Sequence, residues 1–266
     1  MGIAVDTVGL QGATGVNPAF AALAALTGDS LQIRSFAQTD QARLEAIIFG
    51  TPGAAGRLRI TSPKLHDNVT GLTFQPPEQP QLHMIPREVG VPMYPGDTLV
   101  ASAGTTAAST AVVGLVNYYR NLPGQAARLT DWPSLKGNIK AIKPIEVVTS
   151  AAIAAWTDTP VNTTDKQLHA RSDYAVLGFQ TSAACDLVGV KGQETGNLRN
   201  CGSGAAATFD VSEWFIAMSE QQGTPHIPVF NADNQGAFNV STLHSAAIAT
   251  LSVFLILAEL MTPFAG

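Results

Sequence analysis

Two stretches of the chain repeat one pattern at a constant spacing, and this repeat limits the fold more than any other feature. LEAIIFGTPGAAGRLRI (residues 44–60) aligns without a gap with YAVLGFQTSAACDLVGV (residues 174–190), so that Phe49 matches Phe179. Each copy reads as a strand, a turn of small residues and a second strand. Self-similarity at a long, fixed spacing indicates two structural units of the same kind in tandem.

A second pair of stretches supports the duplication. GVPMYPGDTL (90–99) matches HIPVFNADNQ (226–235), and the match continues from STAVVGLVNYY (109–119) to SAAIATLSVFL (245–255). The offset is 130 residues for the first pair and 136 for the second, so the second copy has a modest insertion. At that place DVSEWFIAMSEQQG reads as a helix with Asp210 as N-cap, Glu213 in a capping box and Gly223 past its end.

Most of the remaining pattern is that of β-strands. From Leu31 onward, short alternating runs are separated by Gly, Pro and Asp at a spacing of roughly 8 to 12 residues, which is typical of a β-sandwich or barrel. A short helix is predicted near Asp131, and EVVTSAA (146–152) is predicted to be the first strand of the second copy. We therefore predict an all-β protein with this organisation: an arm at residues 1–30, a first β-domain at 31–124, a connecting segment at 125–143 and a second β-domain at 144–266.

The longest apolar run, AAIATLSVFLILAELM (246–261), has 16 residues. A membrane-spanning helix needs about 20. Its partner in the repeat, TAVVGLVNYYRNLPGQ (110–125), is rich in β-branched residues and stops at Pro-Gly, as a long strand does. We predict that residues 246–257 form the closing strand of the second domain, with one face on its own core and the other covered by a neighbouring barrel or subunit.

The N-terminal stretch NPAFAALAALTGDS is predicted to be a short helix, with Asn17 as N-cap, Pro18 in the first turn and Gly28 past its end. Two interpretations are open for this helix: it packs on its own domain, or it is an arm that contacts a partner or a membrane surface. Three apolar residues share one stripe and are the candidate interior-facing or membrane-facing contacts: Phe20, Leu23 and Leu26.

Charged residues make up 13% of the chain, about half the usual 25%. Either this is a weakly charged monomer, or neighbouring subunits cover its flanks, because interface cores are depleted in charge. The net charge is −5 and no basic cluster occurs. Direct binding of nucleic acid is not expected, since phosphate neutralisation needs concentrated positive charge.

No motif predicts catalysis, a cofactor or a metal site. The five histidines are isolated, and His66-Asp67 is interpreted as part of a turn. Cys185 and Cys201 are predicted to be free buried thiols. The tryptophans, Trp132, Trp156 and Trp214, are interpreted as packing anchors, with a sugar-binding platform as the alternative. Tyr118 and Tyr119 are adjacent on a strand and should point to opposite faces.

The paired hairpins FGTPGAAGRLRI and FQTSAACDLVGV, with the paired entries VPMYPGDTL and IPVFNADNQ, resemble the double jelly-roll major capsid proteins of icosahedral viruses, the tectivirus and adenovirus-like lineage that includes bacteriophages. The likeness covers about residues 31–261. It implies two tandem eight-stranded jelly-roll barrels with short helices in connecting loops. It also implies a homotrimer that forms a pseudo-hexameric capsomer of a virion shell assembled in the host cytoplasm.

The resemblance further implies minor capsid and vertex proteins as partners, and an internal membrane contacted by the N-terminal arm. Two other classes remain open. A trimeric spike or sugar-binding β-sandwich would use exposed tryptophans. A two-barrel metalloenzyme would need clustered histidines around a metal, a pattern that this sequence lacks.

Overall fold

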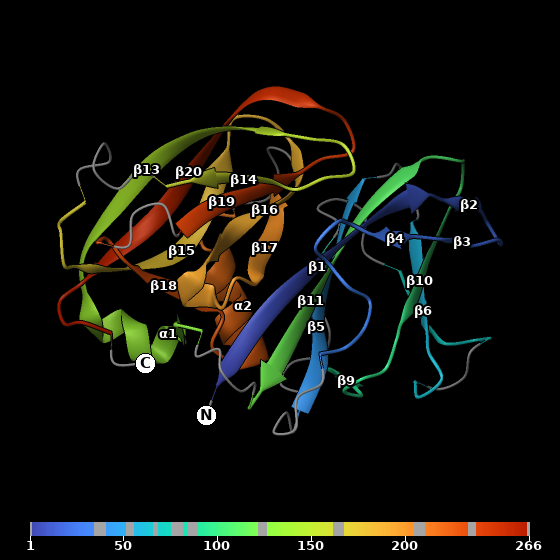
Figure 1. Ribbon diagram of the computed structural model, residues 1–266, viewed down its shortest axis with the longest axis horizontal. Coiled ribbons are helices and arrows are strands. Elements are labelled where there is room, and N and C mark those ends of the chain that lie inside the picture. Colours follow the sequence, from blue (N-terminus) through green and yellow to red (C-terminus); the bar gives the residue numbers. More distant parts are fainter. Residues whose placement is uncertain are drawn as a thin grey trace.

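The computed structural model describes residues 2–34, 41–51, 56–65, 69–75, 82–84, 90–121, 127–161, 168–204, 211–233 and 238–264. In this part of the chain the fold is all-β, and four sheets carry nearly all of the regular structure. Every described strand pair is antiparallel except the short pairing of β2 with β10. The chain forms two β-rich halves side by side (Figure 1), the N-terminal half (residues 2–121) and the C-terminal half (residues 127–264).

The described residues of the N-terminal half form eleven strands: β1 (Ile3–Ala13), β2 (Gly15–Val16), β3 (Ala21–Ala22), β4 (Ala24–Ala25), β5 (Gln41–Thr51), β6 (Arg57–Thr61), β7 (Leu72–Phe74), β8 (Leu82–Met84), β9 (Val91–Met93), β10 (Val100–Thr105) and β11 (Thr110–Arg120). One sheet has the order β4-β1-β11-β5-β8, with β9 also paired to β5. The other has the order β2-β10-β6-β7, with β3 also paired to β10. Leu44, Leu58 and Leu115, from strands of both sheets, share one buried core.

In the C-terminal half the part that the structure describes has nine strands and four short helical segments: β12 (Leu129–Thr130), α1 (Trp132–Leu135), η1 (Lys136–Asn138), β13 (Ile139–Ala151), β14 (Thr157–Pro160), β15 (Asp173–Thr181), β16 (Cys185–Gly192), η2 (Gln193–Thr195), β17 (Arg199–Gly204), α2 (Trp214–Gln222), β18 (Ile227–Asn231), β19 (Phe238–Leu243) and β20 (Ile248–Leu260). Its sheets are β12-β18-β15-β20-β13 and β14-β19-β16-β17. Phe230 and Phe238, one from each sheet, stack with ring centroids 4.3 Å apart. This strand order is consistent with a jelly-roll sandwich.

The apolar run near the C-terminus is a strand, as predicted. β20 lies between β13 and β15, and Leu251, Val253 and Leu255 on its inner face are fully buried. On its outer face Phe254 and Ile256 are only partly buried. Nothing in the described part of the chain covers this outer face completely.

The two stretches of the repeat form matching strands, but not with the residue-by-residue alignment predicted from sequence. Phe49 stands opposite Val113 in the β5–β11 ladder. The predicted alignment would place Phe179 opposite Ala249, whereas its partner in the β15–β20 ladder is Leu255. The difference of six residues is even, so each side chain keeps its face. The hydrophobic pattern is the same at both offsets, so the sequence alone could not distinguish the correct alignment from one shifted by six residues.

The predicted N-terminal helix is wrong. Asn17 and Pro18 lie in a turn, and β3 and β4 follow. The backbone N–H of Leu23 donates to Ala101 O on one sheet, and that of Leu26 donates to Gly9 O on the other. These bonds to two sheets replace the local bonds of a helix, and tertiary contacts of this kind override the helix propensity of alanine.

The predicted arm at residues 1–30 is also not separate from the first β-domain. β1 pairs with β11 along its whole length, from Ile3 opposite Arg120 to Ala13 opposite Thr110. The N-terminal half therefore begins near the start of the chain and not at residue 31. The first strand of the second copy, predicted at residues 146–152, is present as β13, but it begins at Ile139, inside the predicted connecting segment at 125–143. β13 pairs with β20 as β1 pairs with β11.

The helices of the C-terminal half follow the predicted signals in part. Asp131 caps α1, with its Oδ1 accepting a hydrogen bond from Ser134 N at 2.8 Å. α2 ends at Gly223, which has the left-handed conformation. Glu213 is the N-cap of α2 without a side-chain bond, and Asp210, the predicted cap, lies outside the described residues. None of the described helices is long and apolar enough to cross a membrane.

Because Leu255 is fully buried at the centre of the second core, Leu255→Ala should leave a cavity that the neighbouring strands cannot fill. We expect it to lower the free energy of unfolding by about 2–5 kcal/mol. Met261→Ala, at an exposed side chain beyond the end of the same strand, is the matched control and should change it by less than about 0.5 kcal/mol. Chemical denaturation followed by tryptophan fluorescence measures both, and equal losses would contradict the burial of β20.

Candidate functional site

The two halves meet on the outer face of the β1-β11-β5 sheet. This face lies toward β16, β17 and α2 in Figure 1. Its apolar side chains belong to the same buried cluster as the core of the C-terminal half: Val5, Ala46, Ile48, Val112, Val116 and Tyr118. β11 is consequently buried on both faces, with Tyr119 in the first core and Tyr118 at the junction. The prediction that these tyrosines point to opposite faces is confirmed.

Three glycines allow the halves to approach closely at this junction. A Cβ atom on Gly9 would stand 2.7 Å from the Trp156 ring, and one on Gly114 would stand 2.9 Å from Leu187 Cδ2. A Cβ on Gly50 would overlap Asp186. Real Cβ atoms do not approach other atoms this closely, so a larger residue at any of the three positions would force neighbouring atoms to shift.

Two β-bulges of β5 lie at the same junction. In the β5–β11 ladder Val116 stands opposite Ala46 and Asn117 opposite Leu44, which leaves Glu45 as the extra residue. The second bulge leaves Gly50 as the extra residue in the same way. Bulges redirect side chains out of the regular alternation of a strand. Here they bring Glu45 and Gly50 against the C-terminal half.

Glu45 is the centre of a buried polar cluster that joins the halves. The side chain is completely buried. It accepts a hydrogen bond from Arg43 Nε at 2.6 Å and pairs with His226 Nε2 from the C-terminal half. The amide of Gln222 donates to the backbone carbonyl of Glu45 at 3.1 Å, and Thr224 Oγ1 also contacts its carboxylate. Burial of a carboxylate is tolerated here because charged and polar partners surround it.

A second polar cluster joins the halves around Arg199. Its guanidinium donates to Asp29 Oδ1 at 3.2 Å and to Asp158 Oδ2 at 3.0 Å, and it stacks on Trp156 with 4.7 Å between Cζ and the ring centroid. Trp156 Nε1 and the Gly9 N–H both donate to Asp29 Oδ2. Burial raises the pKa of Asp29 above its ordinary value. The hydrogen bonds from Trp156 and Gly9 and the positive charge of Arg199 only partly oppose this rise. Arg199 of the C-terminal half, stacked on Trp156, is thus paired with the carboxylate of Asp29 in the N-terminal half.

Two further surfaces lie at opposite ends of the molecule (Figure 1). The first is the outer side of β13 and β20, here called the β13–β20 face: Ile142, Pro144, Glu146, Val148, Phe254 and Ile256. Ile142 and Val148 are 51% and 58% exposed, a large exposure for two aliphatic side chains on one strand, β13. The second is the outer side of β6 and β10, here called the β6–β10 face: Phe20, Arg57, Arg59 and Val100.

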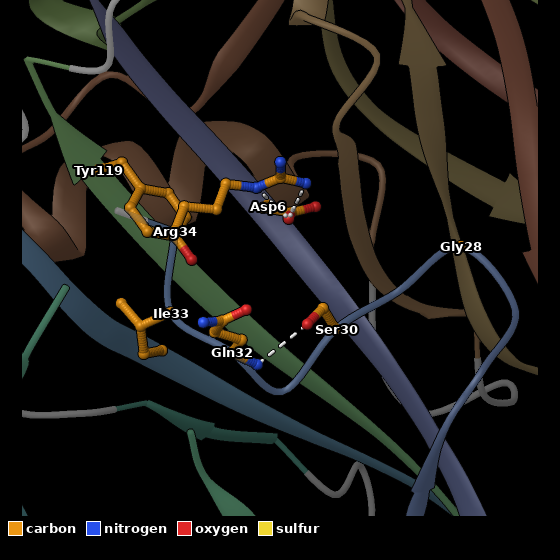
Figure 2. A pocket seen from close by; sticks show the side chains of 7 residues that line it. All are labelled: Asp6, Gly28, Ser30, Gln32, Ile33, Arg34 and Tyr119. Atoms are coloured by element: carbon orange, nitrogen blue, oxygen red, sulfur yellow. Dashed lines mark hydrogen bonds and ion pairs between the residues drawn. The ribbon is translucent and has the colours of Figure 1, made fainter. Parts of the chain in front are cut away.

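A hollow of about 350 Å³ lies beside β1 in the N-terminal half. Figure 2 shows Arg34 pointing at Asp6, and its Nε and Nη2 atoms lie 3.2 and 3.1 Å from Asp6 Oδ2. Gln32 N donates to Ser30 Oγ on the same loop. Burial raises the pKa of Asp6, and Arg34 opposes the rise. The contact between Arg34 and Asp6 joins the loop at residues 28–34 to β1.

The predicted contact residues do not form one stripe. Leu23 and Leu26 are buried, the former in the first core and the latter at the junction. Phe20 is half-buried and lies under Arg57 and Arg59, with 5.0 and 4.6 Å from its ring centroid to the two guanidinium carbons. In this fold Leu23 and Leu26 are packed inside their own chain, and only Phe20 reaches the surface.

The other residues singled out from the sequence have structural surroundings. Trp214 is buried against Gly202, and Trp156 is the platform under Arg199. Both cysteines are free and buried. Burial raises the pKa of Cys185 to about 12. His66 and Asp67 lie outside the described residues, and no cluster of His, Cys, Asp and Glu with the makings of a metal site occurs in the described part.

Sequence reasoning missed the residues that join the halves. Arg43 and Glu45 interrupt the apolar run RLEAIIF, and Arg199 is the first residue of β17, in the stretch NLRNCG. A charge within an otherwise buried strand is a usable signal, because such a charge must find a partner. The partners Asp29 and His226 are distant in sequence, and nothing local identifies them.

No family model and no curated protein matches this sequence. Among solved structures, a chain of Sulfolobus turreted icosahedral virus has 8% identity and a TM-score of 0.25, with 96% of this chain and 79% of that chain covered. The major capsid protein P2 of bacteriophage PM2 has 8% identity and a TM-score of 0.23, with 95% and 98% covered. Both neighbours are viral, but scores this low decide neither fold nor function.

Because Gly114 faces Leu187 across the junction, Gly114→Val should force the two halves apart. We expect a loss of about 1–3 kcal/mol in the free energy of unfolding, as for overpacked cores. Gly137→Ala, where a Cβ would meet nothing within 4 Å, is the control and should be nearly neutral. Denaturant titration measures both variants, and a neutral Gly114→Val would show that the halves are not tightly packed.

His244 and Asp186 form an ion pair of 2.8 Å beside Gly50. The hydrogen bond to Asp186 raises the pKa of His244, while partial burial lowers it by less. A raised pKa stabilises the fold below the ordinary histidine value, and this contribution is lost as pH rises through the folded-state value. His244→Gln should therefore destabilise the protein at about pH 6 more than at about pH 8, as measured by thermal unfolding. An effect that grows with pH would contradict the pairing.

Proposed function

We propose that this chain is a major capsid protein, a structural subunit without catalysis, that trimerises into a pseudo-hexameric block of an icosahedral viral shell. The proposal rests first on the two halves having the same strand order. The order β1-β11-β5-β9 matches β13-β20-β15-β18, and β3-β10-β6-β7 matches β14-β19-β16-β17. We therefore interpret the chain as two tandem eight-stranded jelly-roll barrels.

The observation that carries the proposal is the way the halves pack. The outer face of the first β1-β11-β5 sheet is covered by the β16–β17 side of the second half. The equivalent face of the second half is the β13–β20 face, which remains open, as does the β6–β10 side of the first half. Inside the chain, one face of the first half packs on one side of the second half, and the two equivalent faces at the ends of the molecule remain open. Such a chain is suited to head-to-tail assembly.

Head-to-tail contacts produce closed rings when the rotation between units closes. With two similar units in each chain, three copies would place six similar barrels around a pseudo-six-fold axis. Such coverage of flanks also accounts for the low charge content of the chain. In this proposal the protein is a virion component assembled in the host cytoplasm, with minor capsid and vertex proteins as further partners.

Sedimentation equilibrium and negative-stain microscopy of the purified chain test the proposal. We expect a stable trimer of about three times the 27.7 kDa chain mass, seen as particles with three-fold symmetry and six lobes. A protein that stays monomeric at high concentration, or that forms two-fold dimers, would contradict it.

A further inference from the structure

The β6–β10 face presents two arginines without a carboxylate partner among the described residues. Arg57 and Arg59 alternate with the buried Leu58 and Ile60 on β6, so both point outward. Most of the other described arginines pair with an acid, as Arg34 does with Asp6. A double positive charge on a half-buried sheet face is therefore an exception among the described residues.

Both arginines are held in place before any partner binds. Phe20 stacks against their guanidinium groups, and Arg57 Nε donates to Asn17 Oδ1 at 3.1 Å. The Nε atom of Arg59 is buried and has no hydrogen-bond partner. Stacked, pre-ordered guanidinium groups lose little entropy on binding and favour planar acceptors such as carboxylates.

The β13–β20 face carries the opposite charge among apolar residues. Glu146 lies between Pro144 and Val148 on the outward side of β13. Its Oε1 accepts a hydrogen bond from Ser252 Oγ at 2.6 Å, and no described cation pairs with it. Near the start of β13, Lys140 forms a salt bridge with Glu259. The middle of the face is thus apolar with one exposed carboxylate.

The junction inside the chain shows how these two faces can meet. There Arg199, on β17 of the C-terminal half, stacks on an aromatic ring and pairs with Asp29 of the N-terminal half. Arg57 and Arg59 occupy the corresponding sheet of the N-terminal half and also stack on an aromatic ring. The missing element is a carboxylate from the next unit.

We propose that the β6–β10 face of one copy binds the β13–β20 face of a second copy, with Glu146 of the second copy paired to Arg57 and Arg59 of the first. This contact rests on the proposed function and specifies how the copies are joined. Ile142 and Val148 of the second copy pack beside the arginine pair and exclude water from it, which strengthens the charge pairing.

Charge exchange tests the contact. Glu146→Arg alone, and Arg57→Glu with Arg59→Glu, should each weaken self-association at least about tenfold, or 1.4 kcal/mol. Combining the three substitutions restores opposite charges and should recover most of the affinity. Lys136→Glu, a reversal of an exposed charge in η1 that belongs to neither face as defined above, is the control. Sedimentation velocity over a concentration series gives the affinities, and circular dichroism verifies folding of each variant.

The outcomes separate the two claims. If the wild-type chain assembles and each charge-reversed variant assembles equally well, or if the combined variant fails to recover, this contact is wrong while the capsid proposal stands. If the wild-type chain remains monomeric, the proposed function fails and the contact fails with it. Weakening by either single reversal together with recovery in the combination establishes the pairing, since loss of folding cannot produce recovery.

Discussion

The structure depends on burying the outer face of the β1-β11-β5 sheet. An isolated sandwich would expose Val5, Val112, Val116 and Tyr118 to water, and the second half of the chain removes them from it. The glycines at positions 9, 50 and 114 allow this contact to be close. The bulges of β5 then direct Glu45 and Gly50 into it. The two halves are therefore packed as one body, and the relation between them is fixed by side chains rather than by a linker.

That contact also explains the distribution of charge. Two buried polar pairs join the halves, the ion pair of Arg199 with Asp29 and the contact of His226 with Glu45. Pairs of this kind contribute little net stability compared with apolar residues, but they penalise any alternative register that would leave a charge unpaired. They specify which face meets which. The open faces at the two ends have the same ingredients, a stacked arginine pair on one and a carboxylate among apolar residues on the other.

The strands of the two similar stretches, the closing strand β20, the part of β13 from Glu146 onward and the helix ending at Gly223 could be predicted from the sequence, because alternation and turn residues are local signals. β13 itself begins at Ile139, inside the predicted connecting segment. The arm could not be predicted. Its alanines favour a helix locally, and only the hydrogen bonds from Leu23 and Leu26 to two different sheets show why β3 and β4 form instead. The alignment of β20 with β11 that the sequence predicted is also wrong, because a shift of six residues leaves the alternation of inward and outward side chains unchanged. Arg199 and Glu45 were visible as charges in buried strands, but Asp29 and His226 are brought to them only by the fold.

A cryo-electron microscopy map of the assembled protein tests the central claim most directly, that one interface inside the chain is repeated between chains. The account predicts a three-fold ring of six barrels in which the β13–β20 face of each copy is buried on the β6–β10 face of its neighbour. A ring or dimer in which either face remains exposed to solvent, or in which two copies of the same face meet across a two-fold axis, would contradict it.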